Sequence, residues 1–262
     1  MIDQAAELLA NADALLICAG AGMGVDSGLP DFRGDQGFWQ AYPPYARLGL
    51  RFVELADPVH FVDDPALAWG FYGHRLRLYR DTVPHPGFEL LKRWGADRRV
   101  FTSNVDGQFQ RAGFEHVAEV HGSIHHLQCV EPCTDDIWPA DIEVEVDPET
   151  MRAVGDLPSC RGCGGLARPN ILMFGDYGWV ATRSQAALDE LTAWRRGRPG
   201  LVVVELGAGS AVPTVRRQAE LAAAATGALI RINPREPEVR HGRGISLPMD
   251  ALEALSELAR RS

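Results

Sequence analysis

The sequence lacks the features that mark a membrane-bound or nucleic-acid-binding protein. No apolar run approaches the ~20 residues that a membrane-spanning helix needs. Positive charge is not in excess, because 26 Lys and Arg against 35 Asp and Glu give a net charge of -9, whereas sequence-independent nucleic-acid binding needs a basic surface. The first seven residues contain no basic stretch of the kind that opens a secretory signal. We therefore expect a cytoplasmic protein with neither membrane nor nucleic acid as a partner.

Cysteine is also scarce, with five among 262 residues, but four of them form two close pairs, Cys129 with Cys133 and Cys160 with Cys163. Four thiolates in this spacing predict a closed tetrahedral Zn²⁺ site, which is structural because no coordination position stays open for a substrate. Two disulfides are the alternative, which the lack of an export signal disfavours. The fifth cysteine, Cys18, lies in an apolar run and is expected to be buried.

Five short apolar runs predict buried parallel strands, because strands covered on both faces of a sheet are almost continuously apolar. These runs cover residues 14–18, 99–102, 117–120, 201–204 and 228–232. Helical patterns cover residues 3–10, 86–95, 181–196 and 213–226. Alternating strands and helices favour an α/β fold with a Rossmann-like, doubly wound parallel sheet. Residues 35–60, rich in aromatics and proline, predict a long loop leading into helices.

The residues that follow the five predicted strands are polar or glycine-rich. In an open parallel sheet, ligands bind at the carboxyl ends of the strands. The five segments therefore predict one crevice that holds the active site. In chain order they are Gly20-Ala-Gly, Ser103-Asn104-Val-Asp106, His121-Gly, Gly207-Ala-Gly-Ser and Asn233-Pro.

Four segments resemble the motifs of one family, in that family's order. Residues 20–33 are similar to the sirtuin pattern G-A-G-x-S-x-x-S-G-I-P-D-F-R, and residues 102–106 to T-Q-N-x-D. Residues 119–122 are similar to E-L-H-G, and residues 168–176 to R-P-x-V-V-x-F-G-E, with the two cysteine pairs placed as in the family. The chain is thus identified as a member of the sirtuins, the NAD-dependent protein deacylases.

The resemblance implies two domains and two bound groups, NAD and a structural Zn²⁺. A large Rossmann-like NAD-binding domain would comprise residues 1–50, 82–122 and 176–262, and a small helical and zinc-binding domain residues 51–81 and 123–175. An acyl-lysine protein would enter the cleft between them from one side and NAD from the other. The expected products are nicotinamide, O-acyl-ADP-ribose and free lysine.

The resemblance also implies roles for single residues. His121 would be the general base that takes a proton from a ribose hydroxyl, a task that suits a neutral imidazole, and Asn104 would act beside it. His125 and His126 are expected to be packing or surface residues, since the thiolates already fill the zinc shell. The expected contacts to NAD are Gly20, Ala21, Gly22, Asp31, Phe32, Arg33, Ser103, Asn104, Asp106, Gly207, Ala208, Gly209 and Asn233.

Residues 171–176 resemble the strand that pairs with the acyl-lysine peptide, which makes Ile171, Phe174 and Gly175 expected substrate contacts. Backbone pairing of this kind gives loose sequence specificity. An ordinary buried strand is the alternative at this place.

Tyr72 and Arg75 resemble the pair that binds the acyl carboxylate in the desuccinylase and demalonylase members of the family. At i and i+3 of a helix the two side chains share a face, and a guanidinium can hold a carboxylate bidentately. The alternative is a basic helix face, because Arg77 and Arg80 lie close by.

Three departures from the family pattern fall on the cofactor-facing loops. Gly24 replaces a serine, Ser103 replaces a glutamine, and residues 207–209 read Gly-Ala-Gly where the family has G-T-S. Each removes or shortens a side chain that could hydrogen-bond NAD, so the chain is a divergent member by this measure. ADP-ribosyl transfer to protein, NAD hydrolysis and non-enzymatic NAD sensing therefore stay open as alternatives. The sequence leaves open the protein substrates, the preferred acyl group and the oligomeric state.

Overall fold

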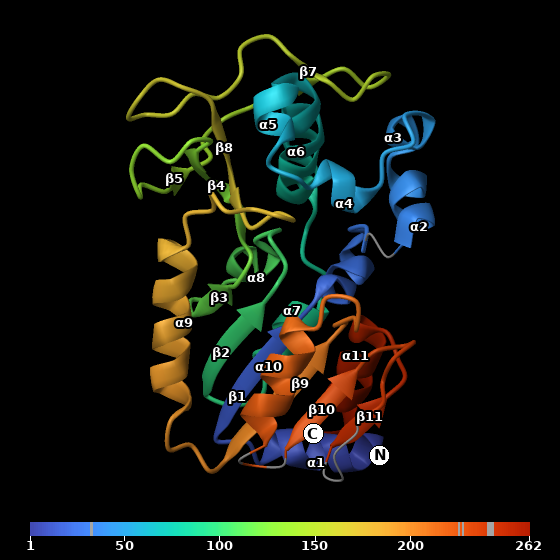
Figure 1. Cartoon of the computed structure of the whole chain (residues 1–262). Helices are drawn as coiled ribbons and strands as arrows, with labels where there is room; N and C mark the ends of the chain where they lie inside the picture. The colour runs from blue at the N-terminus through green and yellow to red at the C-terminus, as the bar shows by residue number, and fades with distance from the viewer. Residues whose placement is uncertain (32–33, 225, 227, 240–243) are drawn as a thin grey trace.

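The computed structural model describes residues 1–31, 34–224, 226, 228–239 and 244–262, so the predicted NAD contacts Phe32 and Arg33 lie outside the described residues. The centre of the fold is a six-stranded parallel sheet in the order β11-β10-β9-β1-β2-β3 (Figure 1). Its strands are β1 (Ala14–Ala19), β2 (Asp97–Thr102), β3 (Val117–Glu119), β9 (Leu201–Leu206), β10 (Leu229–Ile232) and β11 (Ile245–Leu247).

The strand order reverses at β1, which pairs with β2 on one side and with β9 on the other. This is the order of a doubly wound sheet, whose ligand crevice lies at the carboxyl edge of the strands that flank the reversal. All side chains of β1 and β9 are buried, because helices cover both faces of the sheet. The predicted Rossmann-like fold is therefore confirmed.

Two apolar clusters lie against the sheet. One contains side chains of α1 (Ile2–Ala10), α7 (Gly87–Leu91) and α11 (Ala251–Arg261), and the other contains side chains of α9 (Thr182–Arg195) and α10 (Thr214–Ala223). The five predicted strands and four predicted helices all correspond to elements of this domain. The strand β11 was not predicted, because its three residues, Ile-Ser-Leu, do not form a continuous apolar run.

The rest of the chain builds a smaller unit above the carboxyl edge of the sheet (Figure 1). It holds an antiparallel sheet in the order β5-β4-β8 and a two-stranded sheet, β6-β7. The strands are β4 (Gly122–Cys129), β5 (Trp138–Pro139), β6 (Glu145–Val146), β7 (Ala153–Val154) and β8 (Ala167–Ile171). The helices are α2 (Gly34–Ala41), α3 (Pro43–Arg47), α4 (Phe52–Leu55), α5 (His60–Asp63) and α6 (Pro65–Asp81).

The prediction of a long loop over residues 35–60 is wrong, because α2, α3 and α4 occupy much of this segment. Its aromatic side chains form a buried cluster against α6: the ring centroids of Phe38, Tyr42 and Tyr45 lie 5.6 to 6.0 Å from that of Phe71. These residues pack in the apolar core of the smaller unit. The boundary predicted at residue 50 places them in the larger domain, and the division of the chain into domains stays a prediction.

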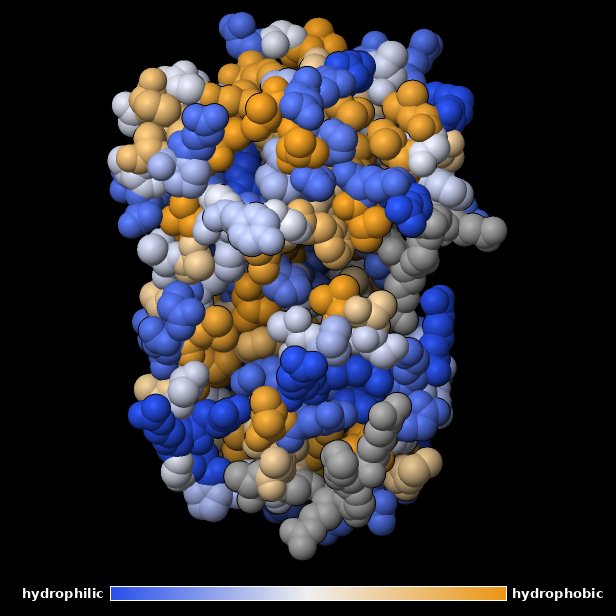
Figure 2. All heavy atoms as spheres, viewed as in Figure 1, coloured by the Kyte–Doolittle hydropathy of each residue, from blue (hydrophilic) through white to orange (hydrophobic). Residues whose placement is uncertain are grey.

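The space-filling view shows the surface hollowed between the upper and lower halves of the molecule (Figure 2). The hollow lies at the level of the carboxyl ends of the parallel strands, where the predicted site residues gather. Among the described residues, no helix combines the length and the apolar character needed to cross a membrane.

Candidate active site

The loops that follow β1 and β9 interlock through their backbones. The amide of Gly20 donates to the carbonyl of Leu206 at 2.9 Å, and the amide of Gly22 donates to that of Gly207 at 3.0 Å. Gly207 has a φ of 58°, and a Cβ added there would lie 2.4 Å from the Cα of Gly22. A Cβ on Gly20 would lie 2.8 Å from the Cα of Ala208. Only glycine fits at both positions, so the two loops pack backbone against backbone where the strand order reverses.

A short 3₁₀ helix, η1 (Ala21–Ser27), continues the loop after β1. His85, which lies just before α7, holds it in place. The amide of Gly87 donates to His85 Nδ1 at 3.0 Å, so Nε2 carries the proton and donates to the carbonyl of Met23 at 3.0 Å. Ala21 is exposed at the start of η1, and Asp31 is half-buried where the described segment ends.

The end of β2 is tied to the same loop. The side-chain amide of Asn104 donates to the carbonyl of Gly20 at 3.0 Å, and the backbone amide of Ser103 donates to that of Ala19 at 3.3 Å. Thr102 Oγ1 accepts from the amide of Asn104 at 3.0 Å and thereby fixes the turn. Asn104 and Ser103 are both half-buried. The structure therefore brings the second predicted segment against the first.

Asp106 is a buried carboxylate in this corner. Its Oδ1 accepts from the amide of Gln108 at 2.9 Å. Burial, with the nearby Glu119 adding to it, raises the pKa of Asp106 to about 6, although Arg75 acts in the opposite direction. Its Oδ2 lies 3.7 Å from the point that a Cβ on Gly24 would occupy. Asp106 thus lies beside Gly24, one of the positions at which the chain departs from the family pattern.

His121 lies where the chain leaves the parallel sheet and enters the antiparallel one. β3 ends two residues before it, and β4 begins directly after it at Gly122. Gly122 has a φ of 79°, and a Cβ there would come within 2.0 Å of the carbonyl oxygen of Asn170. The carbonyl of His121 accepts from the amide of Leu172 at 2.9 Å. Burial lowers the pKa of the half-buried His121 imidazole from its ordinary value.

The predicted substrate strand is shorter than expected. Ile171, which pairs with Gly122, is the last residue of β8, an edge strand of its sheet, and residues 172–176 form no strand. They form a turn that is closed by a fully buried pair, in which Arg168 donates to the two carboxylate oxygens of Asp176 at 2.7 and 2.9 Å. Phe174 and Gly175 are exposed on this turn. The prediction of a strand beyond Ile171 is therefore wrong.

Tyr72 and Arg75 share a buried face of α6, so the alternative of a basic helix face does not hold for Arg75, which is 5% exposed. The guanidinium of Arg75 lies 5.1 Å from the ring centroid of Phe71 and 5.7 Å from that of Tyr72. It also donates to the hydroxyl of Tyr79 at 2.7 and 3.1 Å. The buried hydroxyl of Tyr72 has no hydrogen-bond partner among the described residues.

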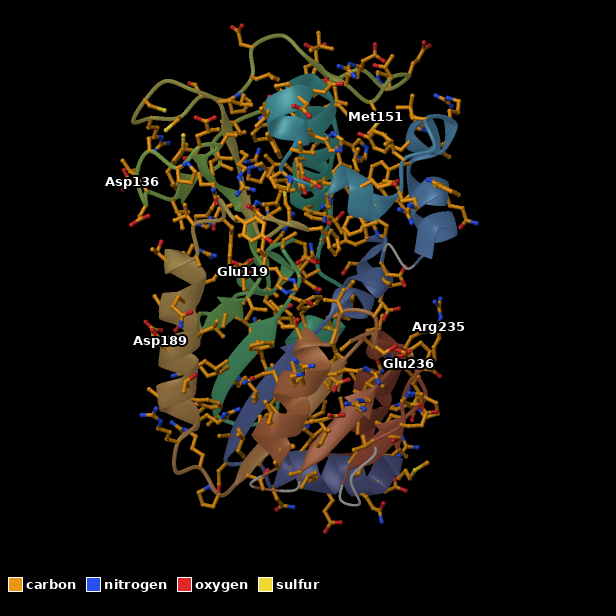
Figure 3. The ribbon with its side chains drawn as sticks, in the orientation of Figure 1. Glu119, Asp136, Met151, Asp189, Arg235 and Glu236 are labelled. Carbon is orange, nitrogen blue, oxygen red and sulfur yellow. The ribbon has the colours of Figure 1, made fainter. Side chains whose placement is uncertain are left out.

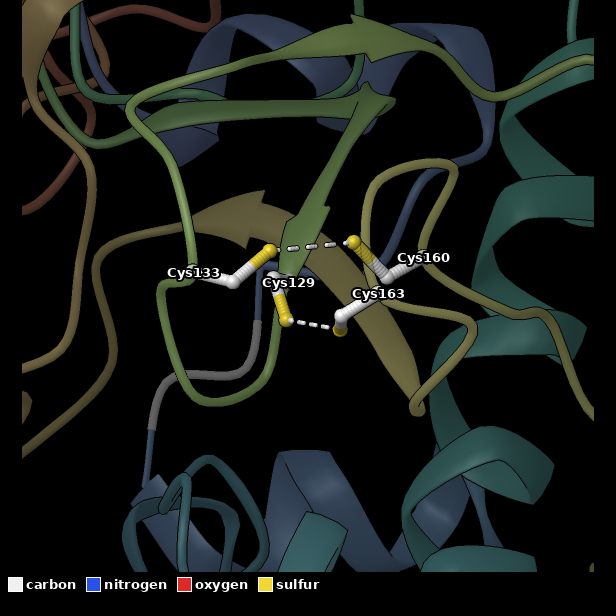
Figure 4. A group of neighbouring side chains, drawn as sticks. All are labelled: Cys129, Cys133, Cys160 and Cys163. Atoms are coloured by element: carbon white, nitrogen blue, oxygen red, sulfur yellow. Dashed lines mark hydrogen bonds between the residues drawn. The ribbon is translucent and has the colours of Figure 1, made fainter.

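The four cysteines Cys129, Cys133, Cys160 and Cys163 converge, with their sulfur atoms all within 4.8 Å of one another (Figure 4). The distances Cys129–Cys163 and Cys133–Cys160 are 3.7 and 3.6 Å, which fit the edge of about 3.8 Å that a tetrahedron with Zn–S bonds of ~2.3 Å requires. Cys129 ends β4, which begins beside His121, so seven residue steps place the metal roughly 20 Å from the imidazole. The donor set and the distance fit a structural Zn²⁺.

Asn233, at the end of β10, is fully buried and shapes the loops around it. Its side-chain amide donates to the carbonyl of Ala208 at 2.9 Å, while its Oδ1 accepts from the amides of Arg235 and Glu236. Glu236 in turn accepts from the amide and the hydroxyl of Ser210, at 3.0 and 2.6 Å. Figure 3 shows Arg235 and Glu236 at this edge of the molecule.

The family model described as "Sir2 family" matches residues 20–192 of the chain. The chain belongs to the Sir2 family. A relative from Pseudomonas aeruginosa named NAD-dependent protein deacylase 1 is 34% identical over 260 residues, with 98% of this chain and 97% of the relative covered. A relative from Mycolicibacterium paratuberculosis named NAD-dependent protein deacylase is 32% identical over 259 residues, with 94% and 97% covered.

Solved structures give the same assignment. A crystal structure of a Sir2 homolog–NAD complex aligns with a TM-score of 0.77 and 28% identity, and covers 98% of this chain and 92% of the other. The glycine-rich turns after β1 and β9, packed too closely at Gly20 and Gly207 for any side chain, stand at the reversal of the strand order, where dinucleotides bind in doubly wound sheets. The residues of this Sir2-family chain therefore suit NAD.

Two supports of this Sir2-family site were not predicted. His85 holds η1, and the Arg168–Asp176 pair holds the turn that carries Phe174. Both supports are visible in the sequence, because His85 stands between two prolines and the oppositely charged Arg168 and Asp176 stand at the two ends of one motif. Neither could be assigned, because the contacts depend on how the chain folds back on itself.

Proposed function

We propose that this Sir2-family chain is an NAD-dependent protein-lysine deacylase, which transfers the acyl group of a modified lysine to the ribose of NAD. The observation that carries this proposal is the strand order β9-β1-β2-β3, in which the interlocked glycine loops, Asn104 and His121 follow the carboxyl ends of neighbouring strands. The relatives named above carry deacylase names, and the residues suit the same reaction.

Bound NAD would supply the ribose carbon C1′ as the electrophile for the acyl oxygen, with nicotinamide as the leaving group. The glycine turns after β1 and β9 would hold the pyrophosphate, through contacts other than the amides of Gly20, Gly22 and Gly207, which already donate to backbone carbonyls. Asn104, tied to Gly20, orients the ribose, and Asp106 accepts a hydrogen bond from the nicotinamide amide. The remaining expected NAD contacts are Ala21, Asp31, Phe32, Arg33, Ser103, Ala208 and Gly209, with Asn233 acting through the loops that it holds.

His121 acts as the general base. It takes the proton of a ribose hydroxyl, which frees that oxygen to attack the acyl carbon. Burial holds the imidazole pKa below its ordinary value, so the base is neutral and ready to accept a proton at pH 7. A variant that binds NAD and peptide but lacks the imidazole, His121→Ala, should release no deacylated peptide.

The protein substrate lies along the edge strand β8 and the turn after it, where Ile171, Phe174 and Gly175 offer backbone groups to an extended peptide. The zinc site holds the other end of the β4–β8 pair. Its four thiolates need a reducing compartment, so we place the protein in the cytoplasm.

The acyl group enters a pocket that contains Arg75 and Tyr72, and the pocket prefers a succinyl or malonyl group over acetyl. The terminal carboxylate of these groups would pair with the buried guanidinium and with the Tyr72 hydroxyl, which has no other partner among the described residues. The aromatic walls keep water from competing for the carboxylate.

This function is tested with NAD and matched acetyl-, malonyl- and succinyl-lysine peptides, with the products identified by mass spectrometry. Arg75→Met should lower kcat/KM for the succinyl peptide about 30- to 150-fold and spare the acetyl peptide, since a buried charge-assisted pair contributes roughly 2–3 kcal/mol. Tyr72→Phe should lower kcat/KM for the succinyl peptide severalfold, and the exposed control Arg77→Met should change kcat/KM for neither peptide. An equal loss for both peptides contradicts the acyl assignment, and a mass gain on the protein in place of deacylated peptide contradicts deacylation.

A further inference from the structure

A groove of about 590 Å³ begins where the turn that carries Phe174 and Gly175 ends. Its floor is the segment of residues 177–181, one wall is the loop around the zinc site, and the other is the first half of α9. Tyr177 lies on the floor, Asp135 on the wall of the zinc loop, and Gln185 and Asp189 on the wall of α9. The groove is therefore a continuation of the surface that is proposed to hold the substrate peptide.

The charged side chains that line this groove are all acidic. Asp135 and Asp189 contribute carboxylates from opposite walls, and none of the lining residues, all of them described, is Lys or Arg. Asp136 and Glu190 are exposed next to them along the chain. The neighbouring cation on α9, Arg183, is engaged elsewhere, since it pairs with Glu119 at 2.7 Å. Figure 3 shows Asp136 and Asp189 on the same side of the molecule.

The shape of the groove suits an extended segment of chain. On α9 the exposed residues Thr182, Gln185, Ala186 and Asp189 follow the i, i+3, i+4, i+7 spacing of a single helix face, and only the last carries charge. The ring of Tyr177 is fully exposed at the opposite rim, where its face can receive a guanidinium or ammonium group.

We propose that this groove binds a positively charged segment of the protein substrate, on one side of the acyl-lysine. The inference rests on the proposed deacylase function and adds a substrate class to it. Tyr177 lies two residues beyond Gly175, and the stretch of α9 from Thr182 to Asp189 is about 10 Å long. At ~3.4 Å per residue of extended chain, the favoured Lys or Arg residues stand roughly three to six positions from the acyl-lysine.

The test uses four fluorescently labelled succinyl-lysine peptides of equal length. One is neutral, one carries three arginines at positions three to six before the acyl-lysine, one carries them after it, and one carries three glutamates at the better of these two places. Binding is measured by fluorescence anisotropy and turnover by mass spectrometry. The proteins are wild type, Asp135→Asn/Asp189→Asn, Asp135→Lys/Asp189→Lys, and the control Glu7→Gln/Glu253→Gln, which removes two exposed charges on α1 and α11. Zinc content and Tm are recorded for each.

Wild type and control should bind one of the two arginine peptides about tenfold more tightly than the neutral one, with the preference falling steeply at high salt. Asp135→Asn/Asp189→Asn should abolish this preference and leave the neutral peptide unaffected. Asp135→Lys/Asp189→Lys should favour the glutamate peptide. The same preference in all four proteins, or none in wild type, overturns the groove proposal. Because binding needs no chemistry, these outcomes stand even where no peptide is deacylated, a result that would count against the proposed function alone.

Discussion

Replacing Gly207 by alanine should damage the cofactor site more than any neighbouring glycine change. The φ of 58° costs an L-residue about 1–2 kcal/mol. The added methyl group would also lie 2.4 Å from backbone atoms of Gly22, which cannot rotate away as a side chain could. Displacing the loops to relieve such crowding costs about 1–3 kcal/mol more. We therefore expect a loss of about 2–5 kcal/mol in the free energy of unfolding and a Tm lower by roughly 5–15 °C.

Two other glycines of the chain separate the cost of the positive φ from the cost of the steric crowding at Gly207. Gly155→Ala carries the positive φ, at 82°, with nothing within 4 Å of the new methyl group, so it should show the conformational cost alone. Gly209→Ala has neither a positive φ nor a neighbour within 4 Å and should leave the Tm unchanged. Thermal unfolding measures stability, and calorimetry at a temperature where every variant is folded measures NAD affinity, which should fall at least tenfold for Gly207→Ala and stay unchanged for Gly155→Ala, outside the expected NAD contacts. If Gly207→Ala leaves both the Tm and the NAD affinity of the wild type unchanged, the interlocked loops do not form the NAD site.

Three further outcomes are expected. Because burial lowers the pKa of His121 and the base must be neutral, activity should be lost only as the pH falls through a value below about 6.5, and a kcat/KM profile with its acid limb above pH 7 would contradict this. Asp176→Asn should leave the buried Arg168 unpaired and cost about 3–5 kcal/mol in denaturant unfolding, whereas Asp81→Asn, which breaks an exposed pair, should cost less than about 1. Removing zinc with a chelator, or Cys163→Ser, should abolish peptide turnover by unfolding the metal loop while NAD binding persists, and loss of both together would place the metal nearer the cofactor.

The sequence was informative wherever a local pattern determined the structure. The five predicted strands end within two residues of the ends of the apolar runs, and the cysteine spacing alone predicted the metal site. The sequence pattern did not predict the helices within residues 35–60. Their residues Phe38 and Tyr45 pack on Phe71, and this contact leaves no periodicity in the local sequence. The pattern failed again after Ile171, because the buried pair of Arg168 and Asp176 turns the chain.

Contacts between residues far apart in the sequence also determine pKa values and hydrogen bonds of the site. The pKa of Asp106 depends on its burial and on Glu119, thirteen positions later in the chain. Asn233 was expected to contact NAD, yet its amide and carbonyl groups hold the loops that follow β9 and β10. The motif identified the correct residue type, but the role of the side chain depends on partners that only the folded chain supplies.

The pairing of β1 between β2 and β9 has a consequence for synthesis on the ribosome. β1 is entirely buried in the finished protein, and its β9 side has no partner until residue 206 has been made, 104 residues after the end of β2. At 5–20 residues per second this interval lasts about 5–20 s. Throughout it, the nascent chain carries an apolar strand with one open edge, the feature that favours aggregation. Slowed translation between residues 102 and 206 should therefore lower the yield of folded protein, and chaperones that cover strand edges should restore it.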